Sequence, residues 1–195
     1  MALLDLEPAA RRMADLIAGV APESLDATTP CPKYSLGDLV DHVGGLSLAF
    51  TAAATKALGP DSSQAPDPQA SRLGDDWRTR IPRDLMGLAE AWQDPAAWTG
   101  FTQAGGVDLP GEIAGLVALD ELVIHGWDVA RASGQAYDCD LPTLEAVYEF
   151  VAPMSVPGQE AQRIFGPVVE VPEDALLLDR VIGLTGRNPA WPTGS

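Results

Sequence analysis

The segment "ALDELVIHGWDVARASGQ", residues 118–135, constrains the fold of this chain more than any other. It is apolar along most of its length, yet it places Glu121 and His125 four residues apart and Asp128 three residues further on. At about 100° per residue, these side chains fall within the apolar arc of a helix expected over residues 110–133. A helix that is apolar on most sides is buried, so the three polar groups require a role inside the fold.

Only a narrow stripe of this helix, with Asp120 and Arg131, is expected to face solvent. A buried glutamate costs several kcal/mol unless a cation or hydrogen-bond donors compensate it. The i, i+4 spacing brings Glu121 and His125 to one side of the helix, where a single ion can bridge them. For Asp128 two alternatives stay open: it accepts a hydrogen bond from His125 beside a metal, or it forms a salt bridge with Arg131.

A second helix carries the other histidine of the chain. Ser35 is expected to cap it, with Asp38 in the capping-box position, and the helix is expected to run to about Leu58. His42 lies at the edge of its apolar face by the same rule. Two inward histidines and one carboxylate form a ligand set used by catalytic zinc. The spacing also fits a metal-free core in which the same side chains are paired with each other.

Helical periodicity dominates the rest of the chain, and strand signals are few. The segment "WTGFTQAGGVDLPG" predicts a short β-hairpin before the helix that contains Glu121. Residues 1–186 are expected to form one all-α domain, a four-helix bundle with short additional helices, and residues 187–195 a tail. The expected helices cover about residues 5–20, 35–58, 77–92, 110–133, 141–152 and 173–184.

Composition excludes several classes of partner. The chain has 12 basic and 28 acidic residues and a formal net charge of -16, which argues against binding to nucleic acid or to anionic lipid. No apolar run approaches the roughly 18 residues of a membrane span, and the N-terminus has no secretory pattern, so we expect a cytoplasmic protein. Cys31 and Cys139 provide neither a disulfide framework nor a thiolate metal cluster.

Three separated motifs resemble one family. The stretches "TPCPKYSLGDLVDHVGG", "DELVIHGWDVARASGQ" and "LTGRNPAW" are similar, in this order, to the mycothiol-dependent maleylpyruvate isomerase N-terminal family, within the DinB-like superfamily. The resemblance implies a DinB-like four-helix bundle that binds a divalent metal, usually zinc, with nickel and iron as alternatives. Carried over by position, the metal ligands are His42, Glu121 and His125. Asp128 is a candidate to hydrogen-bond His125 beside them.

The resemblance also implies a reaction. In the family the metal activates a small thiol, mycothiol, which then attacks an electrophile in a transfer or isomerisation. The chain is expected to lack the second domain of the full isomerase, so the alternative is a non-catalytic metal- or small-ligand-binding module that acts through a partner or as a homodimer. Trp127 is expected to pack between helices. Arg187, in the third motif, is expected to pair with an acidic helix end and to have no catalytic role.

Overall fold

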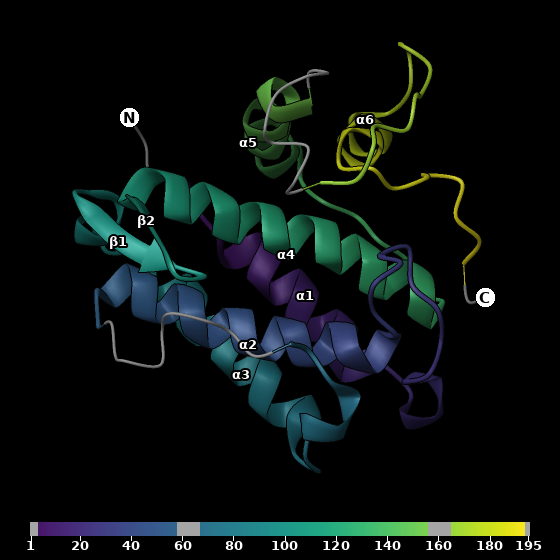
Figure 1. Ribbon diagram of the computed structural model, residues 1–195, viewed down its shortest axis with the longest axis horizontal. Helices are drawn as coiled ribbons and strands as arrows, with labels where there is room; N and C mark the ends of the chain where they lie inside the picture. Colours follow the sequence, from purple (N-terminus) through teal and green to yellow (C-terminus); the bar gives the residue numbers. More distant parts are fainter. Residues whose placement is uncertain (1–3, 58–66, 156–164, 194–195) are drawn as a thin grey trace.

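The computed structural model of the protein describes residues 4–57, 67–155 and 165–193. Four long helices form the bundle, and each contacts two others, in the ring order α1–α3–α2–α4 (Figure 1). The predicted all-α fold is confirmed. The bundle helices are α1 (Glu7–Gly19), α2 (Leu36–Thr55), α3 (Trp77–Ala91) and α4 (Gly111–Ser133).

The predicted ends of the four bundle helices agree with the structure within a few residues, and local capping signals set two of them. Ser35 and Asp38 form the predicted capping box at the start of α2. Gly134 ends α4 in the left-handed conformation, with φ 75°, which glycine adopts without a steric penalty. α2 ends at Thr55. Its predicted end, Leu58, and the last two residues of the predicted tail lie outside the described residues.

The predicted hairpin closes one end of the bundle. Strands β1 (Phe101–Ala104) and β2 (Val107–Pro110) pair antiparallel. The turn between them consists of Gly105 and Gly106, both at positive φ, as a tight hairpin turn requires. The Thr102 hydroxyl donates to the Ala53 carbonyl at 2.7 Å, which attaches the hairpin to α2.

Two shorter helices lie outside the bundle ring, on the α4 side (Figure 1). α5 (Leu141–Val151) packs against α4, and α6 (Leu177–Leu184) packs against α5. The predicted start of the last helix at Glu173 is wrong, because the Ala175 amide donates back to the Pro172 carbonyl and Leu176 is extended. Shorter 3-10 turns occupy Pro22–Ser24, Ala70–Arg72, Pro95–Trp98 and Ala152–Ser155.

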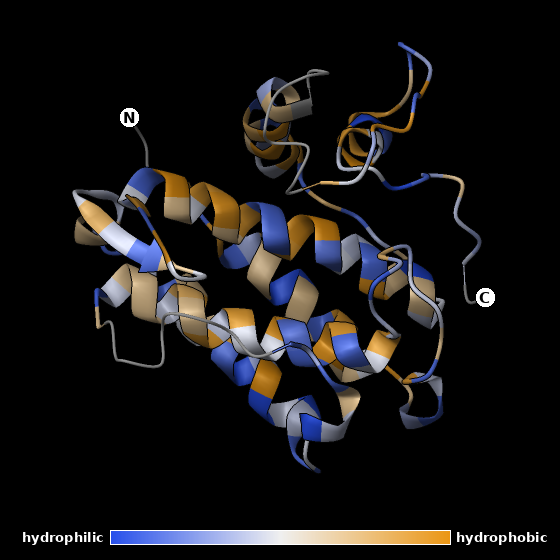
Figure 2. Ribbon diagram, viewed as in Figure 1, coloured by the Kyte–Doolittle hydropathy of each residue, from blue (hydrophilic) through white to orange (hydrophobic). Residues whose placement is uncertain are grey.

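The core lies between the four long helices, and apolar residues occupy most turns of α4 (Figure 2). Trp127 is 4% exposed and belongs to this core, as predicted. Gly115 of α4 leaves room for the indole of Trp98, since a Cβ there would lie 2.5 Å from the ring. Among the helices within the described residues, none combines the length and apolar character that crossing a membrane demands.

Candidate metal centre

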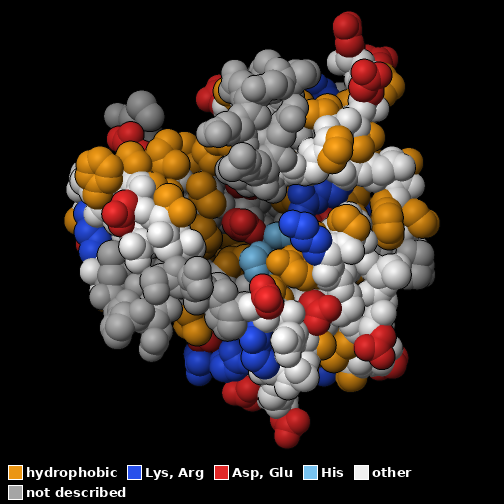
Figure 3. Space-filling model, viewed as in Figure 1, with side chains coloured by type: hydrophobic (Ala, Val, Ile, Leu, Met, Phe, Trp, Pro, Cys, Tyr) orange, Lys and Arg blue, Asp and Glu red, His pale blue; other side chains and the backbone are white. Residues whose placement is uncertain are grey.

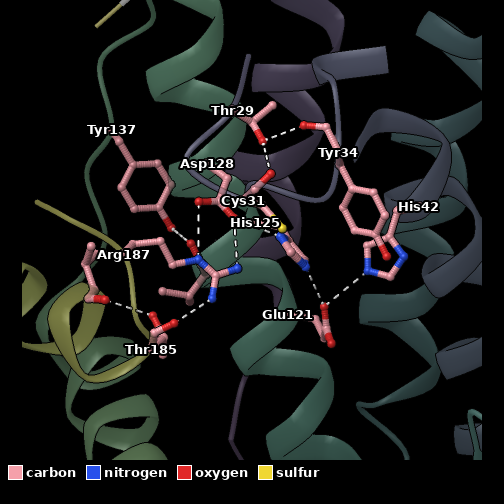
Figure 4. A network of polar contacts seen from close by, with 12 residues as sticks. Thr29, Cys31, Tyr34, His42, Glu121, His125, Asp128, Tyr137, Thr185 and Arg187 are labelled. Atoms are coloured by element: carbon pink, nitrogen blue, oxygen red, sulfur yellow. Dashed lines mark hydrogen bonds and ion pairs between the residues drawn. The ribbon is translucent and has the colours of Figure 1, made fainter. Parts of the chain in front are cut away.

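Two bundle helices bring the three predicted ligands together. His42 comes from the second turn of α2, and Glu121 and His125 come from successive turns of α4, which packs against α2 (Figure 4). Glu121 Oε2 lies 3.5 Å from His42 Nε2 and 3.1 Å from His125 Nε2. One potential ligand atom from each residue lies within 4.8 Å of the others. The separation of 79 positions between His42 and Glu121 in sequence is thus closed by helix packing.

The carboxylate of Glu121 stands between the two imidazoles. Its Oε2 atom is buried, and no hydrogen bond of good geometry reaches it from any residue in the described part of the chain. Burial alone would raise the pKa of Glu121, but the contacts with His125 and His42 hold that pKa well below its usual value. The carboxylate is therefore ionised, and its Oε2 atom lies where it could share a cation with the two Nε2 atoms.

The Nδ1 side of His125 contacts a buried ion pair formed by Asp128 and Arg187. His125 Nδ1 lies 2.9 Å from Asp128 Oδ2, and Arg187 Nη2 donates to the same oxygen at 3.1 Å (Figure 4). Burial would lower the pKa of His125, but Asp128 and Glu121 raise it to about 10. At neutral pH the metal-free imidazole is therefore protonated, with Nε2 facing Glu121, and a cation that binds Nε2 would displace that proton while Nδ1 keeps its hydrogen toward Asp128. This carboxylate–histidine arrangement is typical of protein metal sites.

The loop before α2 covers His42. The Tyr34 ring stacks on the His42 ring with centroids 5.5 Å apart, and the two histidine rings meet edge to face at 5.0 Å. The Thr29 hydroxyl lies 2.7 Å from the Cys31 carbonyl and 2.8 Å from the Tyr34 carbonyl, which holds the loop closed. The "TPCPKY" motif therefore forms a wall that limits the movement of the His42 ring.

A cavity of about 510 Å³ opens beside these residues. The space-filling view shows a hollow near the middle of this face, with histidine at its floor and both acidic and cationic side chains around it (Figure 3). The cavity is lined by the 30–34 loop, by α4 and by residues 165–167 and 185–187. Its volume lies within the range of small-molecule binding sites.

The prediction that Asp120 faces solvent is wrong. The helical wheel placed it on a solvated stripe of α4, but it is 6% exposed and lines the cavity. Burial, together with the charge of the neighbouring Glu121, raises the pKa of Asp120 to about 8. The wheel treated the outer side of α4 as free surface, whereas Phe165 and Arg187 share the cavity wall with Asp120.

The donor set fits a divalent cation. Two imidazole nitrogens and one carboxylate oxygen lie together, the oxygen has no hydrogen-bond partner within the described residues, and a cavity adjoins all three side chains. Catalytic zinc uses three protein ligands of this kind and keeps a further position for water or substrate. His42, Glu121 and His125 could therefore hold zinc, with Asp128 contacting the outer nitrogen of His125.

Sequence reasoning missed two parts of this arrangement. Arg187 pairs with an acidic residue of a helix, as predicted, but its partner is the fully buried Asp128 and it also lines the cavity, which the sequence did not indicate. Arg131, the alternative partner of Asp128, donates instead to the carbonyl of Trp191. The third motif, "LTGRNPAW", was the signal that could have linked Arg187 to the site. The boundary between residues 186 and 187 stays a prediction.

Comparisons with known proteins give one family match over the region that contains the site, and two relatives. The family described as mycothiol maleylpyruvate isomerase N-terminal domain matches residues 6–130, a range that includes all three ligand candidates and Asp128. Two Mycobacterium tuberculosis proteins, one from each of two strains and both described as uncharacterized, are 30% identical over 138 residues, 65% of this chain. The matched segment spans 64% of the length of these curated relatives. No solved structure matches the chain.

Proposed function

Because the chain belongs to the mycothiol maleylpyruvate isomerase N-terminal domain family, we propose that His42, Glu121 and His125 hold a divalent cation, zinc in the first instance, for chemistry on a small thiol. The observation that carries the proposal is the buried Glu121 Oε2, which lies near both Nε2 atoms without a hydrogen bond. A carboxylate is costly to bury, and in the metal-free protein the two imidazoles offset the charge of Glu121. A shared cation compensates it, and the adjoining cavity gives a thiol access to the site.

The cation would supply one chemical effect when bound, which is to lower the pKa of a thiol so that the reactive thiolate forms near neutral pH. The side chains of the protein position the metal ligands. Asp128 holds His125 through Nδ1, and Arg187 holds Asp128 in place. Tyr34 stacks on His42 and limits its rotation. The ligand atoms are therefore positioned before substrate arrives, which lowers the cost of binding.

The reaction class we propose is addition of mycothiol to an electrophile. The thiolate adds to an activated double bond of the electrophile and the adjacent carbon takes up a proton. When this adduct is the final product, the thiol has been transferred. When the adduct releases the thiol again after rotation about the former double bond, the result is cis–trans isomerisation. We place this chemistry in the cytoplasm, where thiols are kept reduced. The alternative is a non-catalytic module that binds the metal or a small ligand and acts through a partner or as a homodimer.

Metal analysis of protein purified without a histidine tag tests the site. We expect zinc in the wild type and its loss in His125→Ala and Glu121→Gln, with zinc affinity reduced by more than about 100-fold, since even outer contacts are worth 10–100-fold. Glu112→Gln is the matched control, because Glu112 is an exposed glutamate on the same helix. Equal zinc content in Glu121→Gln and Glu112→Gln would refute the ligand assignment.

Titration of mycothiol into the zinc protein tests the second half of the proposal. Binding followed by turnover with an electrophile supports a transferase or isomerase, with zinc as a Lewis acid. Binding without turnover across electrophile classes favours the non-catalytic module. A zinc protein that binds no mycothiol contradicts the thiol chemistry while leaving the metal site intact.

A further inference from the structure

Asp120 is a buried acid that the metal centre does not use as a ligand. It is 6% exposed, and its Oδ1 atom has no hydrogen-bond partner among the residues that the structure describes. A buried polar atom without a partner costs on the order of 1–3 kcal/mol, and more when it is charged. Such groups are few in folded proteins, and each calls for an explanation. The wall of the cavity on which Asp120 lies suggests where its partner comes from.

The cations around the cavity do not satisfy Asp120. Arg187 directs Nε and Nη2 to Asp128 and Nη1 to the Thr185 carbonyl. Lys33, which also lines the cavity, is exposed on the loop before α2. No ion pair to Asp120 is found within residues 4–57, 67–155 and 165–193, whereas Asp128, on the same helix, is fully paired. Asp120 lines the cavity, so its carboxyl group borders the space that a ligand would occupy.

We propose that Asp120 is a specificity-determining residue that accepts a hydrogen bond from a hydroxyl or ammonium group of the thiol-bearing ligand. The inference rests on the proposed function, and it adds which thiols the site selects. A cavity of about 510 Å³ suits a drug-sized ligand, so a cysteine-sized thiol leaves much of it unfilled. Mycothiol carries its cysteine on two polyhydroxylated rings, and those rings offer donors that a simple thiol lacks.

Asp120 could instead serve only as a counter-charge for the cation, because it adjoins Glu121 in sequence and shares its cavity. The two roles predict different effects. A counter-charge acts on the metal, so its removal weakens zinc binding. The binding of every thiol to the zinc site then weakens equally. A hydrogen-bond acceptor for the ligand affects only thiols that carry the matching donor, because a site built to bond a donor rejects the analogue that lacks it.

The test is calorimetric titration of zinc-loaded wild type, Asp120→Ala and Asp120→Asn with two thiols, mycothiol and N-acetylcysteine. We expect Asp120→Ala to weaken mycothiol binding by about tenfold, as for a lost buried hydrogen bond, and to leave the binding of N-acetylcysteine unchanged. Asp120→Asn, which keeps one acceptor oxygen, should lose less. Asp138→Asn is the control, since it makes the same substitution at an aspartate whose side chain is 88% exposed.

Equal loss for both thiols, or a parallel loss of zinc affinity, would overturn the inference in favour of the counter-charge. Unchanged mycothiol affinity in both Asp120 variants would overturn it while leaving the proposed function standing. A wild-type protein that holds zinc but binds neither thiol would overturn the inference and the thiol chemistry together. Thermal melts monitor folding of the variants, and both are expected to fold because the carboxyl group that they lose has no described hydrogen-bond partner at Oδ1.

Discussion

Two buried aspartates of α4 meet different surroundings. Asp128, toward the C-terminal end of the helix, is fully buried and contacts both His125 and Arg187. Asp120, two turns earlier, is almost as deeply buried, but its Oδ1 has no hydrogen-bond partner in the described part of the chain. A carboxyl group is costly to remove from water unless it is paired. The fold compensates Asp128 with its own side chains, whereas Asp120 faces a cavity.

The difference separates two uses of a buried acid. A carboxylate whose partners are fixed orients its neighbours, and here it orients His125. A carboxylate without fixed partners destabilises the folded chain unless a ligand supplies the missing contact. The two residues should therefore respond to substitution with opposite signs, and this expectation can be tested directly.

The largest effect is expected at Asp128. Asp128→Ala leaves Arg187 buried and unpaired, which should lower the free energy of unfolding of the metal-free protein by about 3–5 kcal/mol. Zinc affinity should also fall by about 10–100-fold, because His125 loses its outer contact. Urea denaturation and competition with a chelating dye measure the two effects.

A double variant separates these effects. Asp128→Ala with Arg187→Met removes both charges, so it should recover much of the lost stability and little of the zinc affinity. Asp138→Ala, at the exposed Asp138–Arg12 pair, should change stability by less than about 0.5 kcal/mol. If Asp128→Ala unfolds at the same urea concentration as wild type, the ion pair does not stabilise the fold and the comparison fails.

An opposite effect is expected at Asp120. Asp120→Leu replaces an acid without a hydrogen bond at Oδ1 by an apolar side chain, which should raise the free energy of unfolding of the metal-free protein by about 1–3 kcal/mol. The same measurement in urea checks the sign. Asp84→Leu, on the partly buried side of α3 next to Arg83, controls for added apolar surface. A destabilised Asp120→Leu protein would mean that Asp120 has a structural partner.

The two aspartates also show which parts of the site could be predicted from the sequence. Helical periodicity alone placed Glu121, His125 and Asp128 on one inward side of α4, and His42 on the inner edge of α2. The structure brings all four together. This succeeded because a helix fixes the angle between residues three and four positions apart, so local spacing determines which side chains share a face.

The partners of the two aspartates depend on chain segments far away in sequence. Arg187 reaches Asp128 from 59 positions along the chain, and Phe165 helps to enclose the cavity beside Asp120. A helical wheel contains no information on which later segment returns to cover a helix, so it left Asp120 in solvent. The start of the last helix was predicted wrongly for a local reason. A turn from Pro172 to Ala175 precedes the helix, which begins at Leu177.

A third aspartate extends the comparison to backbone partners. Asp38 accepts hydrogen bonds from the Ser35 amide at 3.1 Å and from the Ala70 amide at 2.9 Å. Burial would raise the pKa of Asp38, but these amides and the Ser35 hydroxyl lower it below its usual value. Asp38→Ala should therefore cost about 1 kcal/mol near neutral pH, the smallest of the three effects.

The effect of Asp38 should depend on pH with a definite sign. Since the folded pKa lies below the unfolded value near 3.9, the stabilisation is fully present above about pH 4 to 5 and is lost as the pH falls through the folded pKa. Thermal melts of wild type and Asp38→Ala should thus converge in acid. Asp15→Ala, at an exposed position of α1, should show no such convergence. A difference between wild type and Asp38→Ala that persists unchanged in acid would mean that packing, and not the ionised cap, connects Asp38 to the Ala70 turn.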